Sequence, residues 1–94
     1  MGQDLKAYEY FSKASKEGVV SVDLYNNWAV SSFELGMVDK SIQLLKKAIK
    51  LSPDHAESHY NLGIAYSQKG MLKEAQEEMG LAMQLRNKSK KARH

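Results

Sequence analysis

The side chains of this sequence most suited to chemistry are two histidines, His55 and His59, which lie four residues apart. On a helix this spacing places both imidazoles on one face, where they could bind a zinc ion together. The glutamate between them, Glu57, comes one position later than the metalloprotease pattern H-E-x-x-H requires. The chain contains no cysteine to complete a thiolate site. We therefore expect no metal and no cofactor, with His59 half-buried in the core and His55 in solvent near a turn.

Serines and carboxylates form no catalytic pattern in the sequence. The serines of the helical segments do not follow the nucleophile-elbow motif, and there is no glycine-rich loop that could hold a phosphate. These serines are Ser31, Ser32, Ser41 and Ser67. Glu77 and Glu78 are expected to form a solvated pair on a helix surface. The sequence therefore predicts a protein that is not an enzyme.

The elements that carry these side chains repeat along the chain. Residues 22–55 can be laid over residues 56–89 without a gap, so that equivalent positions lie 34 residues apart. Identical residues coincide at Asn27 and Asn61, Gly36 and Gly70, Met37 and Met71, Ala48 and Ala82, and Leu51 and Leu85. A period of this length indicates an array of repeats, each of which buries its apolar face by stacking on a neighbour.

Apolar residues recur at helical spacing within each repeat, which predicts two helices per repeat. Gly36 and Gly70 are expected to end the first helix of each repeat, because glycine tolerates a left-handed backbone. We expect Asp39 to cap the helix that follows Gly36, and Pro53 to stand at the opening of the next helix. Residues 5–18 align with the second helix of a repeat, which predicts one further, partial repeat.

These repeats resemble the tetratricopeptide repeat, whose signature is W-x2-L-G-x2-Y in the first helix and A-x3-F in the second. The match in the second repeat consists of His59, Leu62, Gly63 and Tyr66, followed by Ala75, Met79 and Ala82. The match in the first consists of Tyr25, Trp28, Ala29 and Ser32, followed by Ser41, Leu45, Ala48 and Pro53.

The resemblance implies an all-α fold, in which antiparallel helix-turn-helix repeats form a short right-handed α-solenoid of about 2.5 units, with five helices. The expected single domain spans residues 1–94. It divides into the second helix of a partial repeat (5–18), two full repeats (22–55 and 56–89) and a basic tail (90–94).

The resemblance also implies a concave groove, lined mainly by the first helix of each repeat, that binds another protein or peptide. Carried over to this sequence, its lining residues are Asp23, Asn26, Val30, Phe33, Glu34, Glu57, Tyr60, Ile64, Ser67 and Gln68. This wall is apolar in the middle with carboxylates at its rim, so we expect it to prefer an apolar segment flanked by Lys or Arg. Two alternatives stay open: that Phe33 rotates inward to fill the space left by Ser32, and that so few repeats bind nothing alone.

One subgroup of the family clamps the C-terminal carboxylate of heat-shock chaperones with Lys, Asn and Arg side chains of the groove. The groove positions of this chain contain no Lys or Arg, so we do not expect that function here.

The two end helices lack the neighbours that a repeat array provides. Apolar side chains at these ends are Leu5, Tyr8 and Phe11 on the first helix, and Met79, Ala82 and Met83 on the last. Exposed apolar ends predict either an excerpt of a longer protein or a homo-oligomer that associates through them. Self-assembly is therefore the alternative to partner binding in the groove.

The C-terminal segment 86–93 holds five basic residues and no acid. It could contact nucleic acid or an acidic surface, but the net charge of +3 is small and no aromatic residues are interleaved. We interpret it as a solvated helix end, with the last helix running past Leu85 to about Lys90, because Asn87 replaces the closing proline of the repeat. No apolar run reaches the roughly 18 residues that span a bilayer, so we expect no membrane insertion and a cytoplasmic protein.

Overall fold

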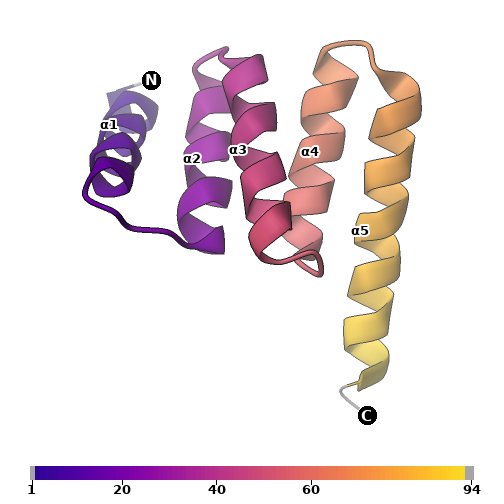
Figure 1. The fold of residues 1–94 in the computed structure, drawn as a ribbon. Helices are drawn as coiled ribbons and strands as arrows, with labels where there is room; N and C mark the ends of the chain where they lie inside the picture. Colours follow the sequence, from indigo (N-terminus) through magenta and orange to yellow (C-terminus); the bar gives the residue numbers. More distant parts are fainter. Residues whose placement is uncertain (1, 93–94) are drawn as a thin grey trace.

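The computed structural model describes residues 2–92, which form five helices that follow one another in antiparallel order (Figure 1). The helices are α1 (Gly2–Lys16), α2 (Val22–Glu34), α3 (Val38–Leu51), α4 (Ala56–Gln68) and α5 (Leu72–Ala92). Each helix packs against the next in the chain, and α2 also contacts α4. The predicted all-α solenoid of helical hairpins is confirmed.

The hairpin turns after α2 and α4 have the same structure. Gly36 and Gly70 have φ angles of 82° and 79°, a region that residues with a Cβ rarely adopt. The N–H of Met37 donates to Ser32 O over 2.8 Å, and the N–H of Met71 donates to Tyr66 O over 2.9 Å. These bonds satisfy carbonyls that the helix end would otherwise leave unpaired. The prediction that both glycines end their helices is confirmed.

The helix starts differ from the expected caps. The side chain of Ser21 accepts the N–H of Leu24 over 3.0 Å and so caps α2. Asp39 does not cap α3, which begins after Met37 without a side-chain cap; its carboxylate instead pairs with the ammonium of Lys69 across the hairpin turns. That expectation is therefore wrong.

The start of α4 also corrects the sequence interpretation. Pro53 and Asp54 lie in the turn before this helix, and neither opens it. The cap is His55, whose Nδ1 accepts the N–H of Ser58 over 3.2 Å. An N-terminal acceptor of this kind satisfies one of the free N–H groups of the first turn.

Small residues allow the helices of each hairpin to approach closely. Ala29, Ala48 and Ala65 are completely buried, and the hydroxyl of Ser41 donates to Ala29 O over 2.8 Å between α2 and α3. The large side chains of the core cluster are Trp28, Leu44, Leu45, Leu62 and Tyr66. This core holds α2, α3 and α4 in fixed positions, and the candidate site lies among these three helices.

The last helix is the longest and extends well beyond the other four (Figure 1). The prediction that it runs past Leu85 is confirmed, and it continues to Ala92. Residues 90–92 of the expected tail therefore belong to α5, and residues 93–94 lie outside the described part of the chain. Within residues 2–92, the helices are all too short or too polar to cross a bilayer.

Candidate functional site

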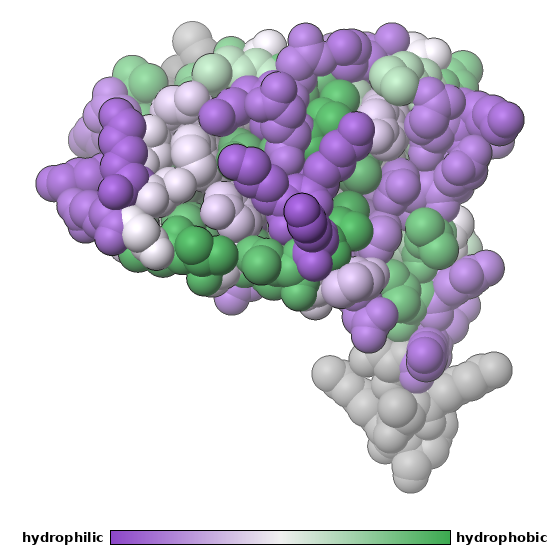
Figure 2. Space-filling view, viewed as in Figure 1, coloured by the Kyte–Doolittle hydropathy of each residue, from purple (hydrophilic) through white to green (hydrophobic). Residues whose placement is uncertain are grey.

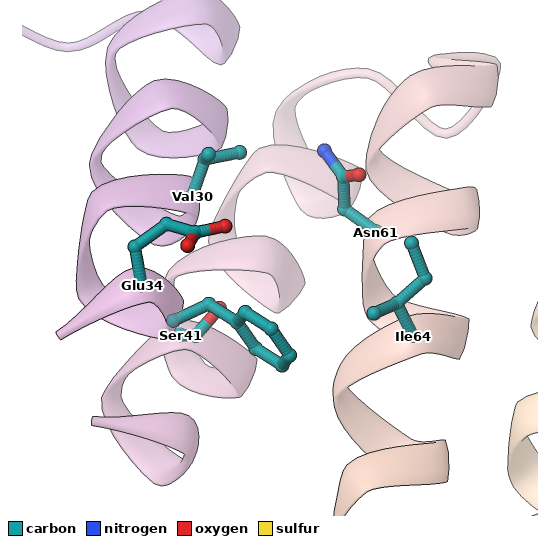
Figure 3. A pocket seen from close by; sticks show the side chains of 6 residues that line it. Val30, Glu34, Ser41, Asn61 and Ile64 are labelled. Atoms are coloured by element: carbon teal, nitrogen blue, oxygen red, sulfur yellow. The ribbon is translucent and has the colours of Figure 1, made fainter. Parts of the chain in front are cut away.

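A hollow of about 380 Å³ opens between α2, α3 and α4. Its walls are Val30, Phe33 and Glu34 of α2, Ser41 of α3, and Asn61 and Ile64 of α4 (Figure 3). Val30 and Glu34 lie one helical turn apart and face Asn61 and Ile64 across the opening. The packing of α3 behind α2 and α4 closes the hollow at its base.

The hollow has an apolar interior and a carboxylate at its edge. Val30 is 41% exposed, and its side chain lines the opening. Phe33 is half-buried, packs against the core and also lines the hollow, so it combines the two roles considered for it from the sequence. Glu34 is exposed. This combination can accept an apolar side chain and attract a cation beside it.

A hydrogen-bond cluster centred on the buried Asn26 joins α2 and α4 beside this site. The side-chain oxygen of Asn26 accepts bonds from the hydroxyl of Ser58 and the amide of Asn61, each over 3.1 Å. The amide of Asn26 donates to Glu57 over 3.1 Å. Asn26 is 2% exposed, so the prediction that it lies on the groove surface is wrong. Its side chain lies between the two helices and joins them.

The remaining predicted groove residues lie outside the hollow. Their side chains are exposed on α2 and α4 and do not line it: Asp23, Glu57, Tyr60, Ser67 and Gln68. Two lining residues, Ser41 and Asn61, are absent from the predicted set. Asn61 lies three residues before Ile64, and that helical spacing could have placed it on the same wall. Ser41 could not be found in this way, because the resemblance assigns the groove to first helices and Ser41 belongs to a second one.

The two histidines have separate partners within the chain. His59 is 7% exposed; its Nδ1 lies 2.7 Å from a carboxylate oxygen of Glu78, and its Nε2 lies 2.8 Å from Pro53 O. Both ring nitrogens of His59 therefore lie within hydrogen-bond distance of oxygen atoms of the chain. The expectation that Glu78 is a solvated surface residue is therefore wrong. Among the described residues, no three His, Cys, Asp or Glu side chains gather as metal ligands would.

The end helices bury part of the surface predicted to be open. The ring of Tyr8 packs edge-on against Trp28 at 5.9 Å, and Phe11 packs against the core. Ala82 is buried, and Met79 lies against Gly63 of α4. The prediction that these four residues lie open at the ends of the array is therefore wrong, because each packs against a neighbouring helix or the core.

Leu5 and Met83 are exposed, as the sequence predicts. Further exposed apolar side chains that the prediction missed are Tyr10 on α1, and Leu72 and Leu81 on α5.

Comparisons with known proteins agree with this architecture. A family model described as "TPR repeat" matches residues 31–70, and one described as "Tetratricopeptide repeat" matches residues 56–89. Among solved structures, a crystal structure of MamA has a TM-score of 0.86 and 25% identity, over 95% of this chain and 52% of that one. The second TPR of Spaghetti (RPAP3), solved with an HSP90 peptide SRMEEVD, has a TM-score of 0.84 and 19% identity, over 89% of this chain and 78% of that one.

A curated relative is the rhomboid protease GluP of Bacillus subtilis (strain 168), with 39% identity over 49 residues. This match covers 52% of the present chain and 10% of the protease. The chain thus spans about half the length of MamA and a tenth of the length of the protease. Similarity over so small a part of the protease does not bring its activity to this chain.

Proposed function

The chain belongs to the tetratricopeptide-repeat family, and from this premise we propose that it is a non-catalytic module that binds a segment of another protein in the hollow between α2, α3 and α4. The family consists of modules for interactions between proteins, and its repeats present surfaces in place of reactive groups. The proposal places the partner's anchoring side chain against Val30, Phe33 and Ile64.

The observation that carries this proposal is an open apolar hollow with a carboxylate at its edge. An extended segment could insert one apolar side chain between α2 and α4, and a Lys or Arg next to it would lie near Glu34. Asp23 and Glu57 add negative charge on the same two helices. We therefore propose a partner segment with an apolar residue flanked by basic ones.

This chemistry differs from recognition of an acidic peptide in the hollow. The peptide in the Spaghetti (RPAP3) structure contains two glutamates and an aspartate, and that chain is 19% identical to this one. The residues that line the present hollow include Glu34 and no Lys or Arg. An acidic segment would meet a like charge there, which disfavours its binding.

The test is selection from a peptide library with the intact protein as bait. Under this proposal, apolar segments flanked by Lys or Arg are enriched, and Ile64→Asp, which places a charge in the apolar wall, abolishes the enrichment. Ser67→Asp is the matched control, because Ser67 is exposed on the same helix outside the hollow. Equal enrichment by the wild type and Ile64→Asp would refute the groove as the binding site.

A second candidate function is self-assembly through the end helices. Its support is the exposure of Tyr10 (68%) on α1 and of Met83 (66%) and Leu72 (62%) on α5. Apolar surface at the two ends of a repeat array is where a further repeat or a second copy of the chain would pack. Light scattering after size exclusion, across a concentration series, tests it: an oligomer that Met83→Glu dissociates supports self-assembly, and a monomer at every concentration refutes it.

A further inference from the structure

A second hollow, at the opposite end of α2 from Glu34, has the reverse charge. It is a shallow, open hollow of about 570 Å³, lined by Val20 of the α1–α2 link, Tyr25 of α2, and Lys47, Lys50 and Leu51 of α3. Val20 is 62% exposed and Leu51 is 48% exposed. Figure 2 shows hydrophobic surface along the lower edge of the molecule, beneath the α1–α2 link and the ends of α2 and α3.

The lysines of this hollow lie beside its apolar surface without a neutralising partner. The ammonium of Lys47 lies 5.8 Å from the centre of the Tyr25 ring, over its face. The described residues form no ion pair with Lys47 or Lys50, and no carboxylate lines the hollow. The site therefore presents two free cations next to an aromatic ring and two aliphatic side chains.

The 34-residue register shows that the fold does not require these lysines. In the following repeat, the positions of Lys47 and Lys50 are taken by Leu81 and Gln84, which carry no charge. Lysine near the C-terminal end of a helix interacts favourably with the helix dipole, but α5 forms without a lysine at these positions. In the preceding partial repeat, the equivalent helix α1 does carry the pair, as Lys13 and Lys16. Positive charge at these two register positions is thus found in α1 and α3 and not in α5.

We propose that the hollow between Val20, Tyr25 and Leu51 binds an acidic segment of a partner protein that inserts one apolar side chain. The apolar residue of the partner would pack on Tyr25 and Leu51, and carboxylates on either side of it would pair with Lys47 and Lys50. A hollow lined by the Tyr25 ring, between α2 and α3, fits a single inserted side chain better than a flat lipid surface does. The segment it selects is opposite in charge to the one proposed for the groove, so the two sites would hold different partners.

The test uses the full chain and a fluorescein-labelled peptide with two leucines between pairs of glutamates, with fluorescence anisotropy as the readout. Saturable binding that weakens with added salt is expected. Lys47→Glu with Lys50→Glu should weaken it about tenfold or more, because two attractions become repulsions. Leu51→Ser should weaken it several-fold without a change in charge. Lys73→Glu is the control: it makes one such Lys→Glu substitution at an exposed residue of α5 outside the hollow and should leave binding unchanged.

The outcomes distinguish binding in this hollow from peptide binding in the groove and from binding to a membrane surface. Ile64→Asp should leave acidic-peptide binding intact, whereas the double lysine variant should leave the binding of lysine-flanked peptides intact. Absence of saturable binding, or equal binding by the double lysine variant, would overturn the proposal. Co-sedimentation with phosphatidylserine vesicles through the same lysines, with no peptide binding, would also overturn it in favour of a membrane surface. If the double variant does not fold, as judged by circular dichroism, Lys47→Gln with Lys50→Gln and Leu51→Ser give the same test.

Discussion

A carboxylate oxygen of Glu78 lies 2.7 Å from Nδ1 of His59, and this polar pair stands where the preceding repeat has Tyr25 and Leu44. Leu44 is 1% exposed and Tyr25 packs against the core, so the first repeat uses apolar contacts at these positions. The second repeat replaces them by an imidazole held between Glu78 and Pro53 O. The same two register positions therefore support two different ways of joining neighbouring helices.

This replacement predicts strong coupling between the two residues. Glu78→Leu alone leaves Nδ1 of His59 buried without a partner and should lower the free energy of unfolding by about 1–3 kcal/mol. His59→Tyr with Glu78→Leu recreates the residue pair of the first repeat and should recover most of this loss. Urea unfolding followed by circular dichroism measures both. If the changes in unfolding free energy caused by His59→Tyr and by Glu78→Leu simply add in the double variant, the two residues are not coupled.

Replacement of glycine by alanine should have opposite effects on stability at two positions of the α4–α5 hairpin. A Cβ added at Gly63 would come within 2.7 Å of the Met79 side chain and 3.1 Å of Ala75 O, so Gly63→Ala should separate the helices and destabilise the protein by about 1–3 kcal/mol. Gly80 lies inside α5 with no atom near its added Cβ, so Gly80→Ala should stabilise by about 0.5–1 kcal/mol. Thermal unfolding of the two variants should shift in opposite directions. A shift in the same direction would refute the packing role of Gly63.

The docking of α1 can be followed through the only tryptophan of the chain. Tyr8 covers the ring of Trp28 edge-on, and Trp28 is 7% exposed. Tyr8→Ala should admit water to the indole, shift its fluorescence to longer wavelength and lower the stability by about 1–2 kcal/mol. Tyr10→Ala, which truncates an exposed side chain of the same helix, is the control and should leave the emission of Trp28 unchanged.

The sequence predicts the features that depend on the chain's own local preferences. The stops at Gly36 and Gly70 follow from the need for a positive φ angle after the last turn of each helix. The continuation of α5 follows from the absence of a proline at Asn87. Each of these features is decided within a few residues of the chain.

Features that depend on a partner in another helix could not be predicted in the same way. Asp39 suits an N-cap by type, but Lys69 from the next hairpin pairs with it instead. The place of Met79 depends on the space beside Gly63, which only the packed hairpin shows. Of the predicted groove residues, Val30, Phe33, Glu34 and Ile64 line the hollow, whereas Asn26 does not, because the rotation of α2 turns it toward α4.

Asn26 gives the last prediction, because it joins α2 to α4 through three hydrogen bonds. Asn26→Leu keeps the size of the side chain but removes the partners of Ser58, Asn61 and Glu57. Ser58 is completely buried and keeps its contact with His55 Nδ1 over 2.6 Å, but three hydrogen bonds of about 0.5–1.5 kcal/mol each are lost, so we expect a loss of stability of about 1–3 kcal/mol.

The same substitution should weaken peptide binding in the groove without touching its surface. Asn61 is both a partner of Asn26 and a wall of the hollow, so releasing its amide frees that wall to move. Asn27→Leu is the matched control, since Asn27 is adjacent in sequence but exposed, and it should change stability by less than about 0.5 kcal/mol. Chemical unfolding and peptide titration measure the two effects separately. If Asn26→Leu unfolds at the wild-type denaturant concentration, the hydrogen-bond cluster does not hold α2 and α4 together.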